Sequence, residues 1–346
     1  MAGLVRPKPR YDLLILGGGH AGLQAGLKAG LLHQRAVILD RGQKFSRSYY
    51  APAMDNIPGF PDGISGHRLL DLQLSQVRKV AHWTDYVAPV TLGEVRRDGE
   101  EFSVTFERLR TRQTVRGRAL LLALGVVDRM PEVGGKIEPI FPWANFGIVD
   151  YCMICDGHTL PGKTVAVLGD GPLAVNTALD LLHWEPASVT LLTHGRPLLP
   201  GVPEEERQEL LAGLEEHAIP VRTEEIVGFE GIREKRFGLR FADGSSAVFD
   251  KGFSALGWYS THEDVARALG AKVTRDGYVV TDEDGRVLSE HDGQVIPGLY
   301  AAGDQRDGWK QIPEAWAGAE RAVIHAWAFY LSERAPSAAV PGAPDR

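Results

Sequence analysis

The 346-residue sequence has little cysteine, no long apolar run and no excess of positive charge. Its only two cysteines exclude a framework of several disulfides and a four-cysteine zinc site. With 38 Lys and Arg against 45 Asp and Glu, the formal charge of −7 disfavours binding of nucleic-acid phosphates. No uninterrupted apolar segment approaches the roughly 20 residues that span a bilayer. We therefore expect neither a nucleic-acid partner nor a membrane partner.

Length and composition favour a globular protein of two domains. Apolar residues form 44% and charged residues 24% of the chain, and 346 residues exceed what one hydrophobic core usually supports. The start, MAGLVRPKPRYDLLILGGGH, superficially resembles a secretion signal, but three glycines end its short apolar run. We predict a strand there and a cytoplasmic protein, whose thiols stay reduced unless chemistry oxidises them. Residues 333–346, rich in proline and alanine, are expected to form a disordered tail.

A first nucleotide-binding loop is predicted near the N-terminus. The apolar strand Leu13–Leu16 is followed by Gly17, Gly19 and Gly22 in GxGxxG spacing and then by a helical pattern. Glycines at this spacing allow a tight turn and a close approach of the backbone to a pyrophosphate, which the helix N-terminus attracts. The next strand, RAVILD, ends at Asp40, where a carboxylate suits the hydroxyls of a ribose. The pattern predicts a dinucleotide site.

The same arrangement occurs a second time. The strand KTVAVL leads into Gly169, Gly171 and Ala174 in GxGxxA spacing, then a helix and the strand SVTLL. Near the C-terminus a third strand ends in a turn at Gly303 and Asp304, before a helix that starts at Ile312 or Pro313. The fold class predicted is α/β with two Rossmann-like units.

The two cysteines stand together in YCMICDG, just before the second loop. A CxxC pair at the start of a helix or turn brings two sulfurs within bonding distance, and a nearby positive end favours the thiolate. Half of a zinc site is the alternative, but His158 is the only further ligand nearby, so we expect redox chemistry and no metal. His158 is either a helper base or a surface histidine.

These segments together resemble the low-molecular-weight thioredoxin reductase family of FAD-dependent disulfide oxidoreductases. The matching motifs are GGGHAG, DNIPGFPDGISGHRLL, LLALGVVDRMPEVGG, YCMICDG, VLGDGPLA and GLYAAGDQRDGWKQ, in family order from about Tyr11 to Leu331. The resemblance implies an FAD domain in two parts, residues 1–129 and 253–332, with a pyridine-nucleotide domain inserted at residues 130–252. It also implies a homodimer, and a rotation of the inserted domain that presents nicotinamide and dithiol to the flavin in turn.

The resemblance also assigns roles to individual residues. FAD would be bound by Gly17, Gly19, Gly22, Asp40, Asn56, Gly303, Asp304 and Gln311. A nicotinamide dinucleotide would be bound by Gly169, Gly171, Ala174, His194 and Arg196. Electrons would pass from NADPH through FAD to the Cys152–Cys155 pair and on to a protein disulfide such as that of thioredoxin. Cys152 would attack the substrate, Cys155 would face the flavin, and Asp156 would exchange the accompanying protons.

The electron donor is left open by departures from the family pattern. The stretch LLTHGRPLLPG offers His194 and Arg196 in place of a cluster of arginines for the NADPH 2′-phosphate, and Arg222 is a further candidate. In the second loop, Asp170 places a carboxylate beside a bound pyrophosphate, and Pro172 removes one N–H. No acidic residue ends the next strand to select NADH. The donor is therefore NADPH, NADH or a protein such as ferredoxin, or the enzyme uses no pyridine nucleotide at all.

Two other functions stay open on the same residues. The chain is either a reductase, as above, or a small-molecule dithiol oxidase that gives electrons to oxygen, or a flavin-containing redox sensor without turnover. Tyr49 and Tyr50 stand where the family has a glycine-rich stretch, and they either cover the flavin or pack in the core. Trp143, just before the cysteines, either lines a partner groove or packs inside the protein.

Overall fold

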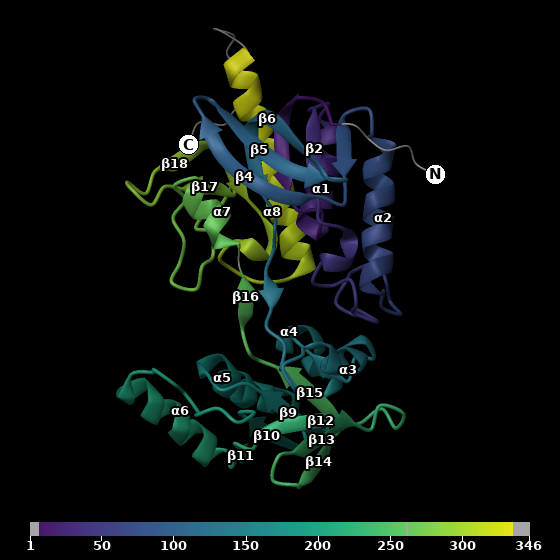
Figure 1. The fold of residues 1–346 in the computed structure, drawn as a ribbon, viewed down its shortest axis with the longest axis vertical. Helices are drawn as coiled ribbons and strands as arrows, with labels where there is room; N and C mark the ends of the chain where they lie inside the picture. Colours follow the sequence, from purple (N-terminus) through teal and green to yellow (C-terminus); the bar gives the residue numbers. More distant parts are fainter. Residues whose placement is uncertain (1–6, 261, 335–346) are drawn as a thin grey trace. The chain divides into compact units, whose positions relative to one another are not determined.

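The computed structural model describes residues 7–260 and 262–334. The described chain divides into two compact units (Figure 1). Unit 1 comprises residues 7–49, 67–126, 260 and 262–334, and unit 2 comprises residues 50–66 and 127–259. The segment that contains Asn56 thus groups with unit 2, although the sequence motif relates it to the flavin.

Unit 1 is built on a mixed eight-stranded sheet in the order β17-β18-β6-β1-β2-β3, extended by the antiparallel strands β5 and β4 beside β6. Its strands are β1 (Arg10–Leu16), β2 (Ala36–Leu39), β3 (Thr84–Val87), β4 (Thr91–Asp98), β5 (Glu101–Arg108), β6 (Thr111–Leu122), β17 (Arg286–Leu288) and β18 (Val295–Ala301). Its helices are α1 (His20–Leu31), η1 (Gln43–Phe45), α2 (Gly66–Lys79), α7 (Glu263–Ala268), η5 (Gly303–Gln305) and α8 (Ile312–Arg334).

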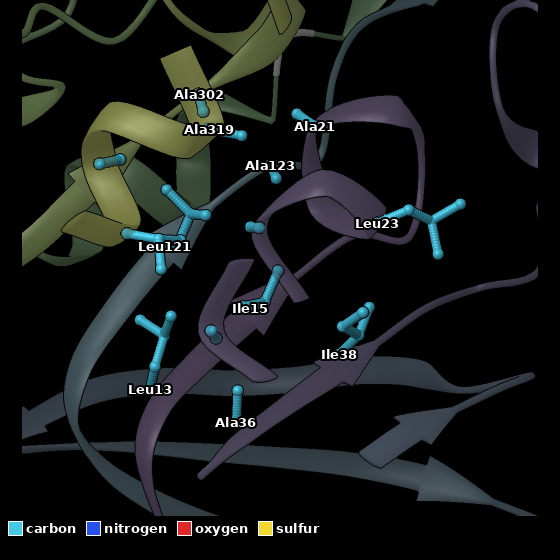
Figure 2. Packing of buried hydrophobic residues seen from close by; sticks show 14 of the residues in the cluster. Leu13, Ile15, Ala21, Leu23, Ala36, Ile38, Leu121, Ala123, Ala302 and Ala319 are labelled. Atoms are coloured by element: carbon cyan, nitrogen blue, oxygen red, sulfur yellow. The ribbon is translucent and has the colours of Figure 1, made fainter. Parts of the chain in front are cut away.

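The central strand β1 is apolar on both faces because both faces of the sheet are covered. Leu13 and Ile15 point into one buried cluster, which α1 and α8 close (Figure 2). Leu14 and Leu16 point into a second cluster on the opposite face. Side chains thus alternate between the two faces along β1. The loop that follows the carboxyl end of β1 leads into the N-terminus of α1.

Unit 2 contains a five-stranded parallel sheet in the order β11-β10-β9-β15-β8, a three-stranded antiparallel sheet β12-β13-β14, and the strand pair β16-β7. Its strands are β7 (Val127–Asp128), β8 (Val149–Asp150), β9 (Thr164–Leu168), β10 (Ser188–Leu192), β11 (Val221–Arg222), β12 (Ile226–Glu230), β13 (Phe237–Phe241), β14 (Ser246–Phe249), β15 (Lys251–Ser254) and β16 (Trp258–Ser260). Its helices are η2 (Glu138–Ile140), α3 (Phe141–Asn145), α4 (Met153–Asp156), η3 (Gly157–Thr159), α5 (Pro172–Asp180), η4 (Leu181–Trp184) and α6 (Glu204–Glu216).

The predicted α/β class with Rossmann-like parallel sheets is confirmed. The apolar run before the first glycines is a strand, and the last helix begins at Ile312. That helix extends to Arg334, and the rest of the predicted tail, residues 335–346, lies outside the described residues. Within the described chain, no helix combines the length and apolar character needed to cross a membrane.

Candidate active site

The first glycine loop is shaped by contacts that exclude side chains. Gly17 has φ +102°, and a Cβ there would collide with the carbonyl oxygen of Ala123. A Cβ on Gly22 would collide with the carbonyl oxygen of Gly17. Gly19 differs, because its nearest neighbour to an added Cβ is Ser46 Oγ at 3.6 Å. The loop therefore packs closely against the protein at Gly17 and Gly22 and is open at Gly19. Gly19 is the N-cap of α1, so the N–H groups of the first helical turn can donate to an acceptor outside the helix.

Asp40 lies at the carboxyl end of β2, beside this loop. Its side chain is buried, and it accepts hydrogen bonds from the Gly18 N–H at 3.1 Å and from the Tyr86 hydroxyl at 2.6 Å. Burial, followed by the charge of Asp40, raises the pKa of Tyr86 and keeps this hydroxyl a donor. The carboxylate still has lone pairs for a ribose hydroxyl, because two ionised oxygens accept about four hydrogen bonds.

The C-terminal motif meets the first loop inside unit 1. A Cβ on Gly303, where φ is +74°, would lie 2.9 Å from Ala21 Cβ in α1, so η5 packs closely on the start of that helix. Asp304 pairs with Arg47 Nη1 at 3.2 Å. Gln311 immediately precedes α8, and its side-chain amide donates to the Lys310 carbonyl oxygen at 3.2 Å. The structure thus gathers most of the residues expected at FAD within one unit.

The remaining FAD residue, Asn56, belongs to unit 2, so its place against the flavin stays a prediction. The aromatic pair is split between two environments: Tyr49 is partly buried against the core of unit 1, whereas Tyr50 is 56% exposed. Trp143 is buried, and its indole N–H donates to the Arg236 carbonyl oxygen at 3.1 Å. Trp143 is therefore a core residue and does not line a groove.

His20, the first residue of α1, is a buried polar residue next to the first glycine loop that was not among the predicted site residues. The ring is buried, with Nδ1 2.5 Å from Gln73 Oε1 and Nε2 2.6 Å from Ser48 Oγ. Burial lowers the pKa of His20, so the imidazole is neutral; it donates to Gln73 and accepts from Ser48. The signal was available in GGGHAG, where a histidine occupies the first helical position after the glycines.

The two cysteines form a disulfide at the N-terminus of α4. Cys152 is the N-cap of this short helix, Cys155 lies one turn later, and their Cα atoms are 5.2 Å apart. The N–H groups of Cys155 and Asp156 both donate to the Cys152 carbonyl oxygen at 3.1 Å. The predicted placement of the CxxC at the start of a helix is confirmed, and the short turn is what brings the sulfurs together.

Asp156 ends the same helix, close to the disulfide in sequence. Desolvation by burial, and secondly the negative charge of Asp150, raise the pKa of Asp156 to about 7. A carboxyl group with this pKa gains or loses a proton readily at neutral pH, as a general acid or base requires. His158 is exposed and pairs with Asp55 at 3.5 Å, so it lies at the surface.

The second glycine loop has the same backbone form but different chemistry. A Cβ on Gly169 would lie 2.6 Å from the Ala255 carbonyl oxygen, whereas no atom lies within 4 Å of an added Cβ on Gly171. Between them, Asp170 pairs with Arg196 Nη1 at 3.8 Å. Pro172 stands at the first position of α5 and donates no N–H. The loop is open to a ligand, and Arg196 has an internal carboxylate partner.

His194 is fixed by backbone groups on both sides. Its Nδ1 accepts from the Ile226 N–H at 2.9 Å, so Nε2 carries the proton and donates to the Glu132 carbonyl oxygen at 2.7 Å. Arg222 lies over the Phe241 ring at 3.9 Å and pairs with Glu224 at 3.3 Å. These basic side chains are thus engaged within the protein.

A cavity of about 130 Å³ lies at this place in unit 2, next to the carboxyl end of β10. Its lining includes Arg129, Glu132, His194, Arg196 and Tyr259. The Tyr259 hydroxyl donates to Glu132 Oε1 at 2.7 Å, so a carboxylate stands among the two arginines. A dianionic phosphate here would meet partly neutralised charge, which fits a 2′-hydroxyl at least as well as a 2′-phosphate.

Comparison with known proteins places these two loops and the disulfide in one class. A model of the pyridine nucleotide-disulphide oxidoreductase family matches residues 11–321, and the chain belongs to that family. A thioredoxin reductase from Claviceps purpurea is 30% identical over 88% of this chain and 89% of its own length. A Listeria monocytogenes thioredoxin reductase is 28% identical over 86% of each chain. The structure of a Streptococcus pyogenes thioredoxin reductase matches the fold with TM-score 0.76 and 21% identity, over 94% of this chain and 100% of that one.

Within the family, this chain is a thioredoxin-reductase-like, FAD-dependent disulfide oxidoreductase. Family membership implies FAD, and the residues of unit 1 fit it: the cradle is open at Gly19, α1 begins there, and Asp40 stands at the end of β2. The isolated FAD residue Asn56 and the nucleotide residues of unit 2 stay predictions.

Proposed function

We propose that this enzyme reduces a disulfide of a thioredoxin-type protein through Cys152 and Cys155. The observation that carries the proposal is the disulfide at the start of α4, next to a carboxyl group whose pKa is raised to about 7. The names of the relatives from Claviceps purpurea and Listeria monocytogenes support the choice of thioredoxin as substrate. The alternatives, a dithiol oxidase and a redox sensor, have no comparable support.

The chain's own residues account for the exchange with substrate. FAD, when bound, supplies the electron pair that converts the disulfide to two thiols. Cys152 then attacks one substrate sulfur as a thiolate, and the other substrate sulfur leaves and takes up a proton. Cys155 attacks Cys152 Sγ, which restores the enzyme disulfide and releases the second substrate thiol. Asp156 holds the proton that a cysteine gives up and passes it to the leaving sulfur.

We propose further that a pyridine nucleotide is the donor and that the enzyme discriminates weakly between NADPH and NADH. The open second loop supports a nucleotide, while the Asp170–Arg196 pair and the two backbone hydrogen bonds of His194 support weak selection for a 2′-phosphate. Binding constants measured by direct titration are expected to agree within about tenfold, because the selective cation–phosphate contact is largely absent. A preference for NADPH above about a hundredfold would contradict this.

The experiment is anaerobic mixing of the FAD-loaded protein with NADPH, with NADH and with reduced ferredoxin, followed by addition of oxidised thioredoxin. The proposal predicts that a nucleotide bleaches the flavin and that thioredoxin thiols then appear. Bleaching by ferredoxin alone would overturn the proposed donor. Hydrogen peroxide release from a small dithiol and oxygen, without thioredoxin turnover, would identify an oxidase, and disulfide-dependent partner binding without turnover would identify a sensor.

The architecture that accompanies this function is also a proposal. We propose an FAD domain of residues 1–129 and 253–332, an inserted domain of residues 130–252, a homodimer, and rotation of the inserted domain during turnover. A crosslink between the two domains is expected to abolish turnover while leaving bound FAD in place. Unchanged turnover in the crosslinked protein would refute the rotation, and a monomeric mass in solution would refute the dimer.

A further inference from the structure

Asp150, two residues before Cys152, forms a buried ion pair with Lys251. Lys251 Nζ donates to Asp150 Oδ2 at 2.6 Å and to the Gly147 carbonyl oxygen at 2.6 Å. The side chains are only 13% exposed for Lys251 and 10% for Asp150. The two residues come from neighbouring parallel strands, since β15 pairs with β8 and Phe253 stands opposite Asp150. The pair is therefore held in place by the sheet and by a backbone carbonyl.

A pair of this kind is poorly explained by stability alone. Desolvation of two buried charges offsets much of their attraction, and apolar residues of similar size are often as stable or more so. The immediate neighbours Ile148, Val149 and Phe253 are themselves buried and apolar. An apolar pair would fit this environment. The two charges are therefore better explained by their effect on another group.

The ionisable group on which this pair acts is Asp156. Asp150 lies two residues before Cys152, whose carbonyl oxygen accepts the Asp156 N–H at 3.1 Å. After burial itself, the negative charge of Asp150 is the largest influence that raises the pKa of Asp156, and Lys251 acts in the opposite direction. Burial raises the pKa of Asp150 too, while Lys251, the largest opposing influence, favours its ionised form.

We propose that Asp150 and Lys251 are a positioning pair that keeps a fixed carboxylate two residues before the dithiol, so that Asp156 enters each turnover carrying its proton. The Lys251 ammonium pairs with Asp150 at 2.6 Å and so favours its carboxylate form, and that negative charge disfavours ionisation of Asp156. The inference rests on the proposed function only in giving Asp156 a task, because the electrostatic coupling itself exists in the oxidised protein.

The proton and electron balance follows from that state. In the reduced enzyme Asp156 holds one of the two protons of the dithiol and Cys155 holds the other, so Cys152 is a thiolate and attacks the substrate disulfide. One sulfur–sulfur bond forms between Cys152 and substrate as the substrate's own bond breaks, and protonated Asp156 neutralises the leaving thiolate. The electron pair comes from the dithiol, which ends as the disulfide.

Other charged side chains also act on Asp156, and their effect has to be distinguished from that of the Asp150–Lys251 pair. His158 and Asp55 also act on Asp156, but their side chains are 54% and 55% exposed and are screened by salt. Lys163 and His158 act on Asp150 in addition to Lys251. The influence of the buried pair on the pKa of Asp156 is therefore expected to be insensitive to ionic strength, whereas the influence of His158 and Asp55 is expected to fall as ionic strength rises.

The test is the pH titration of Asp156 in the oxidised, FAD-loaded protein, followed by NMR of carboxyl-labelled aspartate and assigned with Asp156→Asn. In the wild type, the titration midpoint of Asp156 is expected at about pH 7 and is expected not to change with salt concentration. Asp150→Asn is expected to lower the proton affinity of Asp156 at least tenfold, or about one pH unit. The double variant Asp150→Asn/Lys251→Met, which removes both charges, is expected to recover part of that loss.

The matched control is Asp250→Asn, the same substitution one residue before Lys251, at a carboxylate that pairs with Arg236 at 3.0 Å. It is expected to leave the Asp156 midpoint unchanged. A wild-type midpoint in the ordinary aspartate range would overturn the proposal even if no variant folds. An unchanged midpoint in Asp150→Asn would also overturn it and reduce the pair to a structural role. Failure to reduce thioredoxin with the expected midpoints would refute the proposed function and leave this inference standing.

Discussion

Substituting alanine at two glycines of the first loop separates the folding role of the loop from its cofactor role. Gly22 lies where a Cβ would collide with the Gly17 carbonyl oxygen, a backbone atom that cannot move aside by changing rotamer. Gly19 has φ −75° and ψ −166°, which alanine adopts without strain, and Ser46 Oγ is 3.6 Å from the added Cβ. Gly19→Ala therefore adds a methyl group only to the open side of the loop.

The two substitutions are expected to differ strongly in magnitude. Gly22→Ala is expected to lower the free energy of unfolding by about 3 kcal/mol, the upper range for overpacking, because backbone has to shift. Gly19→Ala is expected to change it by less than about 1 kcal/mol. The same methyl group occupies space that a pyrophosphate would approach, so FAD affinity is expected to fall at least about tenfold.

The assay combines denaturant unfolding of the cofactor-free protein with titration of FAD by flavin fluorescence. Gly22→Ala should lose stability first, and Gly19→Ala should keep wild-type stability with weakened FAD binding. Wild-type FAD affinity in Gly19→Ala would show that the pyrophosphate does not approach this loop.

Three other perturbations test the site. Asp156→Asn is expected to slow disulfide exchange about a hundredfold, and a pH–rate profile should lose the ionisation near 7 through which the wild-type acid is deprotonated as pH rises; an unchanged profile would assign that ionisation elsewhere. Cys155→Ser is expected to accumulate a mixed disulfide between Cys152 and thioredoxin, visible by mass spectrometry, whereas a trapped adduct in Cys152→Ser would reverse the assigned roles. Gly171→Ala, where an added Cβ meets open space, is expected to leave stability unchanged and weaken nucleotide binding about tenfold; equal affinity by calorimetry would remove the second loop from the nucleotide site.

Much of the local structure could be predicted because its signals lie close together in the sequence. The loop glycines and the acid at Asp40 are spaced within a single β-α-β unit, and the cysteines are three residues apart. Strand, turn and helix at those places follow from the glycine spacing and from apolar periodicity.

The tertiary partners could not be predicted in this way. Asp150 and Lys251 are 101 residues apart and meet only because β15 lies between β9 and β8. The Asp170–Arg196 pair and the two backbone contacts of His194 depend likewise on how strands and loops assemble. The available signal was a single charged residue in each of two short apolar strands, which is a reason to look for a partner but does not identify it.

Electron transfer from the flavin through the cysteines to thioredoxin is tested by a thiol count after anaerobic photoreduction of the bound flavin. We expect that alkylation then modifies Cys152 and Cys155, and that prior addition of oxidised thioredoxin protects both while thioredoxin thiols appear in equal number. Thioredoxin that stays oxidised while both cysteines remain reduced would contradict the proposed substrate. A bleached flavin beside an intact Cys152–Cys155 disulfide would contradict the electron path itself.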